Sequence, residues 1–271
     1  MTTPLHTHAL SNDFSIRDCA FSIARLASHY RFACRMYRKR GVRAAARRVL
    51  SIASVYGRQA LLGTVCRPAA RFEFGGRDYR YFRHWHVTTF LNERTVEMPI
   101  VVSELQRHRP RRLLEVGNVL GHYVPTPHVV VDKYERAPGV LNVDAADYDT
   151  EDLFDMIISI STLEHIGWDE HPISPDKTIR VLENLQRLLA PAGRLVCTFP
   201  LGHNPHLDAH LSAGRLPFTN VRYLRRLNAR NEWMEASEDD VADARYNVPF
   251  MHGNAVAVGL IEPSAPSSQR I

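Results

Sequence analysis

The sequence predicts an α/β fold, in which a mostly parallel sheet carries helices on both faces. Three apolar runs support this prediction, at residues 113–117, 128–132 and 154–160, because each is as uniformly apolar as a strand buried on both faces. The first run contains Glu115 near its end, and the second ends at Asp132. Since parallel strands present their carboxyl ends at one edge of a sheet, we expect these polar groups to line one ligand crevice.

The remaining elements alternate as such a sheet requires. We expect further strands at 140–143, 194–199, 232–237 and 254–261, and helices at 176–189 and 219–229. Upstream, residues 71–82 contain a glycine pair typical of a hairpin turn, and residues 86–108 carry the apolar stripe of a helix. Pro99 lies inside that stripe and should kink the helix.

The chain divides into four predicted parts. These are a basic amphipathic helical arm (1–67), a hairpin and helix leading into the core (68–110), the α/β domain (111–262) and a Pro- and Ser-rich tail expected to be disordered (263–271). The 271 residues are enough for one large core with a small extension.

Positive charge is concentrated in the arm. Residues 19–72 hold eleven Arg, one Lys and no acidic residue, so this segment carries +12 and the rest of the chain −7 of the net +5. The arm either covers the main domain with a solvated basic face or docks on an anionic membrane surface. A mitochondrial presequence is a third alternative. The acidic body has no interleaved basic and aromatic patch, which argues against nucleic-acid binding.

Composition also bears on the compartment. No run of 18 uncharged apolar residues occurs, and residues 1–12 lack the basic-then-apolar order of a secretory signal. The four cysteines, Cys19, Cys34, Cys66 and Cys197, are scattered without a CxxC pair. These features predict a cytoplasmic protein with reduced thiols, associated with the membrane periphery if the arm docks on lipid.

The loop after the first run lacks the features of a phosphate-binding loop. Gly117 allows a sharp turn and a close approach of ligand to backbone. Val119, however, stands where a dinucleotide fingerprint needs its second glycine, and only residues 118–127 separate the first two strands. A pyrophosphate needs free N–H groups at a helix start, so the sequence disfavours dinucleotide binding.

These strand-end motifs resemble those of class I S-adenosylmethionine-dependent methyltransferases. The resemblance covers residues 112–200 well and the C-terminal strands weakly, while residues 1–70 lie outside it. It is strongest to the small-molecule branch, such as quinone- or glycan-type O-methyltransferases, which carries Leu-Glu-His after the fourth strand, here residues 163–165. The resemblance implies a Rossmann-like sheet and S-adenosylmethionine as the cofactor.

The resemblance also implies positions around the cofactor for six residues. Glu115, Gly117 and the adjacent Asn118 would lie by its methionine part, Asp132 by the ribose, Asp144 by the adenine and Ser161 near the methyl-donor sulfur. Judged by residue type and position alone, Asp132 and Asp144 are equally suited to cap a turn or helix. Glu115 is equally suited to orient the turn that follows its strand.

His165 is the candidate catalytic base. A sulfonium is already a strong electrophile, so the protein has mainly to align the acceptor and remove its proton. Imidazole titrates near neutrality, and His165 follows the fourth strand, whose end faces the crevice. The alternative is a histidine that caps a turn or packs under the cofactor.

A histidine-rich loop follows the strand at 194–199. His203, His206, Asp208 and His210 have residue types that ligate divalent metals, and His206 and His210 would share a helix face if a helix starts after Pro205. A substrate pocket is the favoured interpretation, and no metal is expected. Its predicted lining is Trp168, His203, Asn204 and Asp208.

The function predicted from the sequence is methylation of a hydroxyl on a small-molecule or glycan-type acceptor. One alternative is a non-catalytic module that binds the cofactor and docks on an anionic surface through residues 19–72. Another is a Rossmann-type sugar-nucleotide enzyme, which would need the phosphate-binding glycine loop that this sequence lacks.

Overall fold

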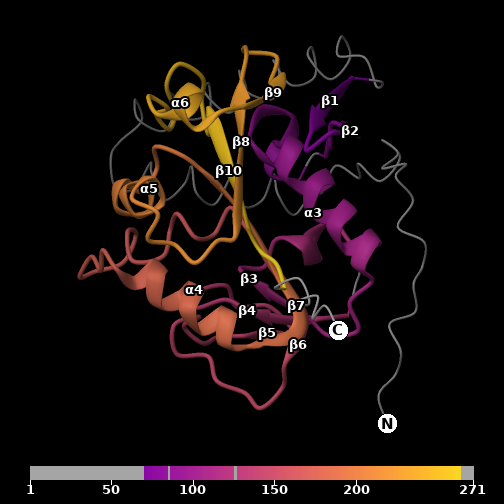
Figure 1. Cartoon of the computed structure of the whole chain (residues 1–271), viewed down its shortest axis with the longest axis vertical. Coiled ribbons are helices and arrows are strands. Elements are labelled where there is room, and N and C mark those ends of the chain that lie inside the picture. The colour runs from indigo at the N-terminus through magenta and orange to yellow at the C-terminus, as the bar shows by residue number, and fades with distance from the viewer. Residues whose placement is uncertain (1–69, 85, 125–126, 264–271) are drawn as a thin grey trace, which may run out of the picture.

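The computed structural model describes residues 70–84, 86–124 and 127–263 (Figure 1). The predicted arm at 1–67 and nearly all of the tail lie outside these residues, so the domain limits stay a prediction. No helix in the described part of the chain is long and apolar enough to cross a bilayer.

The elements follow one another in the order that Figure 1 labels. The first are the hairpin strands β1 (Arg71–Phe74) and β2 (Arg77–Arg80), the 3-10 segment η2 (His86–Leu91) and helix α3 (Arg94–His108). Then come β3 (Leu113–Val116), the 3-10 segment η3 (Leu120–His122), β4 (Val129–Val131), β5 (Val140–Leu141), β6 (Phe154–Ile160), α4 (Lys177–Arg187) and β7 (Leu189–Pro200). The last are α5 (Pro205–Ser212), β8 (Asn220–Arg226), β9 (Trp233–Ala236), α6 (Glu238–Val241) and β10 (Ala255–Ile261).

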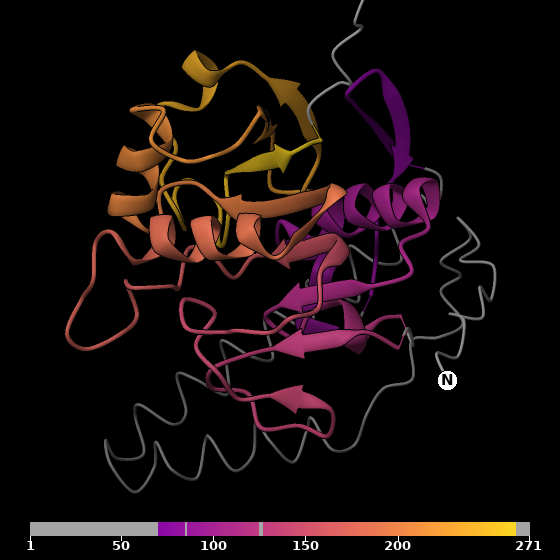
Figure 2. The same ribbon diagram turned by 60° about the horizontal axis from the view of Figure 1, so that its bottom comes forward.

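Eight strands form one sheet in the order β5-β4-β3-β6-β7-β10-β8-β9. The five from β5 to β7 are parallel, and β10, β8 and β9 join by antiparallel pairing. The arrowheads of β3, β4 and β5 point the same way in Figure 2. The chain runs outward from β3 to β5 and resumes at β6 on the other side of β3, so the sheet has a switch point between β3 and β6. The structure confirms the predicted Rossmann-like fold class.

Successive residues of the central strands enter different hydrophobic clusters. Ile157 packs in the cluster that contains Val181, Leu182 and Leu185 of α4. Its neighbour Ile158 packs in the cluster that contains Met98, Val101 and Val102 of α3. Since side chains alternate between the two faces of a strand, α4 and α3 cover opposite faces of the sheet. A third cluster joins the β1–β2 hairpin to Trp233 and Val256.

The predicted helix at 86–108 begins later than expected. Residues 86–91 form the 3-10 segment η2, in which Val87 and Thr88 have positive φ, and the α-helix begins at Arg94. Pro99 lies inside α3 and has no N–H for the carbonyl of Thr95. The N–H of Phe82 donates to that carbonyl instead, at 2.8 Å, so the hairpin segment supplies the missing hydrogen bond.

The predicted helix at 219–229 is wrong, because Asn220–Arg226 is strand β8. It lies between β10 and β9 and pairs with both. Tyr223 packs in the cluster that contains the α4 residues, whereas Leu224 packs with Trp233 in the cluster of the hairpin. This alternation is the period of a strand, and the pairing satisfies backbone groups on both neighbours.

Gly117 lies directly after β3, where the chain passes close to Thr162 just beyond β6. Its φ is +84°, and its N–H donates to the carbonyl of Val131 at 2.9 Å. A Cβ at this position would lie 2.1 Å from Oγ1 of Thr162, the second residue after β6. Only glycine fits both the backbone conformation and the contact.

We therefore predict that Gly117→Ala destabilises the protein more than Gly76→Ala. Gly76 has a φ of +69° but open space at its Cβ position, so alanine there adds only backbone strain of about 1 kcal/mol. At Gly117 the clash with Thr162 adds roughly 1–3 kcal/mol to that strain. Urea unfolding at equilibrium measures both free energies, and equal losses for the two variants would contradict the packing argument.

Candidate functional site

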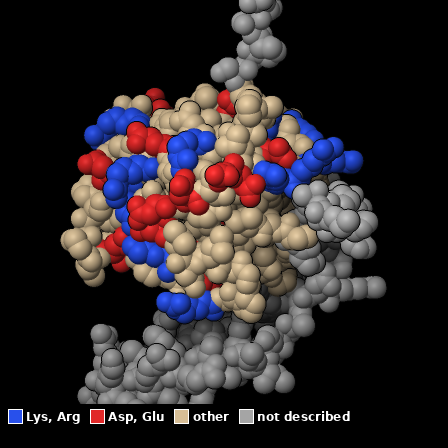
Figure 3. All heavy atoms as spheres, turned by 90° about the horizontal axis from the view of Figure 1, so that it is seen from below, with Lys and Arg blue, Asp and Glu red and all other residues tan. Residues whose placement is uncertain are grey.

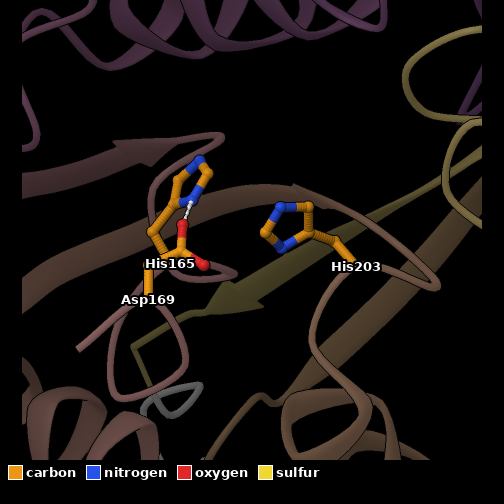
Figure 4. Close-up of side chains that lie close together, drawn as sticks. All are labelled: His165, Asp169 and His203. Carbon is orange, nitrogen blue, oxygen red and sulfur yellow. Dashed lines mark hydrogen bonds and ion pairs between the residues drawn. The ribbon is translucent and has the colours of Figure 1, made fainter. Parts of the chain in front are cut away.

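The site lies at the carboxyl ends of β6 and β7, next to the switch point. His165 and Asp169 come from the segment after β6, and His203 from the loop after β7 (Figure 4). Nδ1 of His165 is 2.6 Å from Oδ2 of Asp169, and the rings of His165 and His203 meet edge to face at 4.8 Å. The His165 side chain is 51% exposed, so a ligand can reach it. An accessible imidazole oriented by a carboxylate is the arrangement of a general base.

His203 links this pair to the interior. Its ring contacts the ring of Tyr246 edge to face at 4.8 Å, on the side of the molecule formed by the loop before β10. Burial and the nearby His165 lower the pKa of His203, and a hydrogen bond with the backbone of Glu164 opposes this. Its Nδ1 is buried and has no hydrogen-bond partner within the described ranges.

His165, Asp169 and His203 are also a group that could hold a metal ion, since one ligand atom from each lies within 4.8 Å of the others. The direct hydrogen bond between His165 and Asp169 leaves no place for an ion between those two atoms, which favours the base. The helix required for a His206–His210 pair does form. However, Nε2 of His210 lies 3.0 Å from the carbonyl of Pro175, which engages that nitrogen away from His206.

Three buried glutamates, Glu93, Glu97 and Glu164, lie near the histidines, and none of them is among the site residues predicted from the sequence. Oγ of Ser161 donates to both carboxylate oxygens of Glu97, at 2.7 and 2.9 Å. Burial, and then the charge of Glu93, raise the pKa of Glu97 to about 7. Burial, and then Glu97, raise the pKa of Glu164 well above its usual range. Ser161, which is predicted to lie near the cofactor sulfur, is therefore bonded to a buried acid of α3.

A signal for Glu97 was present in the sequence. Glu93 and Glu97 are four residues apart, and Val101 follows at the same spacing, so both acids lie on the apolar stripe of the predicted helix. An acid on such a stripe is buried when the helix packs, and all three residues are buried. Buried acids are uncommon outside functional or paired sites.

Asp132 lies at the carboxyl end of β4, as predicted. Its Oδ1 accepts hydrogen bonds from the N–H groups of Tyr134 and Glu135, at 2.8 and 2.7 Å. Its Oδ2 makes no hydrogen bond with the described residues. One oxygen thus shapes the turn, and the other remains for a ligand hydroxyl.

Glu115 is fully buried, and both of its oxygens are engaged. Oε1 accepts from the N–H groups of Val119 and Leu120, at 2.8 and 2.6 Å, and Oε2 is 2.7 Å from Nε2 of His128. The structure therefore favours its turn-orienting role over direct contact with a ligand. In the described residues of the connection, 118–124 and 127–128, the three-residue η3 is the one helical element, as the short gap between the strands implied.

Asp144 is engaged by lysines. Its Oδ2 lies 2.9 Å from Nζ of Lys133 and also binds Nζ of Lys177, while Glu170 binds both lysines. Burial raises the pKa of Asp144, but the hydrogen bonds from Lys177 and Lys133 outweigh it and hold the pKa at about 2. Its Oδ1 accepts from the N–H of Ala146. These contacts favour a structural role for Asp144 over the predicted contact with adenine.

Of the other predicted residues, two stabilise the loop after β7 and two contact neighbouring side chains. Asn204 caps α5 by accepting from the N–H groups of His206 and Leu207, and Asp208 accepts from the N–H of Gly202, so both organise the loop. Burial raises the pKa of Asp208 to about 6. Asn118 donates to Glu135 at 2.8 Å, and the half-buried Trp168 packs edge to face on His206. Of the four predicted pocket residues, His203 packs its ring against that of His165, and Trp168 donates its backbone N–H to the carbonyl of His165 at 3.3 Å.

Comparisons with known proteins give matches in structure only. No protein-family model matches the chain, and no curated protein sequence does. Similar solved structures include the N-methyltransferase NodS of Bradyrhizobium japonicum with S-adenosylhomocysteine. It has a TM-score of 0.40 and 14% identity, over 67% of this chain and 92% of that one. Another is the 1,6-didemethyltoxoflavin N1-methyltransferase of Burkholderia thailandensis, with a TM-score of 0.35 and 17% identity, over 63% and 79%. A third is an S-adenosylmethionine-dependent methyltransferase of Thermotoga maritima, with a TM-score of 0.37 and 16% identity, over 56% and 82%. These three structures are methyltransferases, the class that the strand-end motifs of this chain resemble.

Proposed function

We propose that this chain is an S-adenosylmethionine-dependent methyltransferase that acts on a small-molecule acceptor. The observation that carries the proposal is the exposed His165–Asp169 pair beside His203, at the carboxyl edge of the sheet and next to its switch point. A base at that edge is what methyl transfer to a protonated acceptor needs from the protein.

The loop after β3 fits a nucleoside without phosphates. The N–H groups of Val119 and Leu120, at the start of η3, donate to the buried carboxylate of Glu115. A phosphate would need those donors free and would meet a carboxylate in their place. S-adenosylmethionine carries no phosphate, and the unbonded oxygen of Asp132 is available for its ribose hydroxyls. This charge arrangement disfavours the alternative of a sugar-nucleotide enzyme.

When bound, the cofactor supplies an electrophilic methyl group, and the residues of the chain manage the proton. Asp169 accepts a hydrogen bond from Nδ1 of His165, which leaves Nε2 free to accept a proton from the acceptor. The carboxylate of Asp169 stabilises the imidazolium that forms, and Oε1 of Glu164 lies 3.6 Å from that Nε2. The sequence favours a hydroxyl as the acceptor, yet an imidazole base serves a hydroxyl and a protonated amine alike.

We also propose that the protein is cytoplasmic and attaches reversibly to anionic membranes through residues 19–72. Most of this segment lies outside the described residues, and its +12 charge supports the proposal. On the face seen in Figure 3, acidic and basic side chains of the described residues are interspersed, so this face offers no basic patch of its own.

For the cofactor, we predict that the full chain binds S-adenosylhomocysteine in titration calorimetry, and that Asp132→Asn weakens the binding. Asparagine keeps the bonds to the Tyr134 and Glu135 N–H groups but removes a charged acceptor, which costs about 1.5–3 kcal/mol, or roughly 10- to 150-fold in Kd. Asp132→Ala should weaken the binding at least as much. Tight binding of NAD without measurable affinity for S-adenosylhomocysteine would refute the proposed function.

For the base, we predict that His165→Gln lowers turnover by ~10²-fold or more and leaves S-adenosylhomocysteine affinity nearly unchanged. Asp169→Asn should lower turnover by a smaller factor, because the base remains but loses its orienting charge. Excess chelator should leave turnover unchanged. A parallel loss of cofactor affinity in His165→Gln would show a structural role, and loss of activity on chelation would instead show a metal at the His165–Asp169–His203 group.

For the arm, we predict sedimentation of the full chain with anionic but not with neutral vesicles. Each basic side chain near such a surface contributes about 1 kcal/mol, and salt screens the attraction. Arg→Glu changes at Arg35, Arg38, Arg43 and Arg47 should weaken the binding, and removal of residues 1–66 should abolish it. If the full chain does not sediment with anionic vesicles, the membrane proposal is contradicted, and the alternative that the arm covers the main domain is favoured.

A further inference from the structure

The site holds buried hydrogen-bond acceptors that lack donors. Glu164 is 2% exposed, and its Oε2 has no hydrogen-bond partner among the residues that the structure describes. The same holds for Nδ1 of His203, whose ring shares a hydrogen bond with the backbone of Glu164. A buried polar atom without a partner is destabilising, and two such atoms on residues that one hydrogen bond joins indicate that a ligand supplies the partners.

The surroundings of these atoms are negative. Burial, and then the charges of Glu97 and Glu93, raise the pKa of Glu164. Burial, and then the charges of all three acids, raise the pKa of Tyr246, whose ring packs on His203. Arg94 opposes both shifts but is outweighed by the acids. Glu93 and Glu97 are themselves bonded, to the N–H of Gly253 and the hydroxyl of Ser161. Oε1 of Glu164 lies 3.6 Å from Nε2 of His165 and the residue bonds with its own backbone, but its Oε2 has no partner among the described residues. A ligand group that fits here brings N–H donors and positive charge.

We propose that the acceptor is an amine, held through its N–H groups by Glu164 and His203 beside the base His165. This rests on the proposed function and replaces the hydroxyl that the sequence favoured. An amine has enough N–H groups to bond Oε2 of Glu164 and Nδ1 of His203 together, whereas a hydroxyl has a single hydrogen. The unpaired acceptors therefore distinguish the two acceptor classes.

The charges favour nitrogen for the transfer as well. Nε2 of His165 first takes one proton from the ammonium group, which frees the nitrogen lone pair. The lone pair then forms the new nitrogen–carbon bond while the carbon–sulfur electron pair returns to sulfur, so the positive charge passes from sulfur to nitrogen. The positive charge on nitrogen favours the ionised forms of Glu164 and Glu97, which stabilise that charge in turn, whereas the negative charge of an alkoxide would disfavour their ionised forms.

The test compares matched pairs of probes on the full chain saturated with S-adenosylhomocysteine. Benzylamine with benzyl alcohol, and glucosamine with glucose, differ in one amine and one hydroxyl group. Saturation-transfer NMR titrations should show at least one amine bound about tenfold or more tightly than its alcohol. Glu164→Gln should abolish that preference, and the matched control Glu183→Gln, an exposed acid on α4, should keep it.

Alcohols that bind as tightly as their amines, or an amine preference that survives in a folded Glu164→Gln, would overturn the proposal. Thermal unfolding checks folding. If Glu164→Gln does not fold, Glu97→Gln serves instead, since glutamine can still accept from Ser161 while the negative charge is lost. Absence of S-adenosylhomocysteine binding would reject the proposed function separately, because the probe titrations can be repeated on the chain without it.

Discussion

The parallel pairing of β3 with β6, and the contact of Gly117 with Thr162 just beyond it, is the constraint on which the rest of the site depends. These two strands are adjacent in the sheet although β4 and β5 lie between them in the chain. They are adjacent because strands are added on one side of β3 up to β5, and on its other side from β6 onward. At this switch point the connections after β3 and β6 leave in opposite directions, and a crevice forms at the carboxyl ends of the two strands. The segment after β6 then carries Ser161, His165 and Asp169 to the same edge within nine residues.

Glu115 determines what this edge can bind. A fully buried carboxylate is costly unless its oxygens are hydrogen-bonded, and here two N–H groups and His128 bond it. The same bonds that stabilise Glu115 remove the free donors that a phosphate would use. One buried acid thus organises the turn and disfavours phosphate ligands, with no contribution from a second glycine.

The buried acids Glu97 and Glu164 have a different character. Glu115 is satisfied within the protein, whereas Glu164 has an oxygen without a partner among the described residues, and its pKa is raised by burial and by Glu97. A protein that needed only stability would gain from an apolar side chain at such a position. Buried carboxyls with perturbed pKa values cluster at functional sites, and these lie beside an oriented histidine.

The sequence by itself determined the central strands and the acids that end them, because these depend on local hydrophobic period and on the geometry of parallel strands. It also determined the short connection after β3, since ten residues leave little room for a full helix. The tertiary structure decided what is set by contacts between distant residues. Pairing with both β10 and β9 made a strand of 220–226, two lysines engaged Asp144, and the packing of α3 brought Glu97 to Ser161. Residues 165 and 203 became neighbours because β6 and β7 are parallel and adjacent, and a side-chain contact across two loops leaves no period or spacing in the sequence that would reveal it.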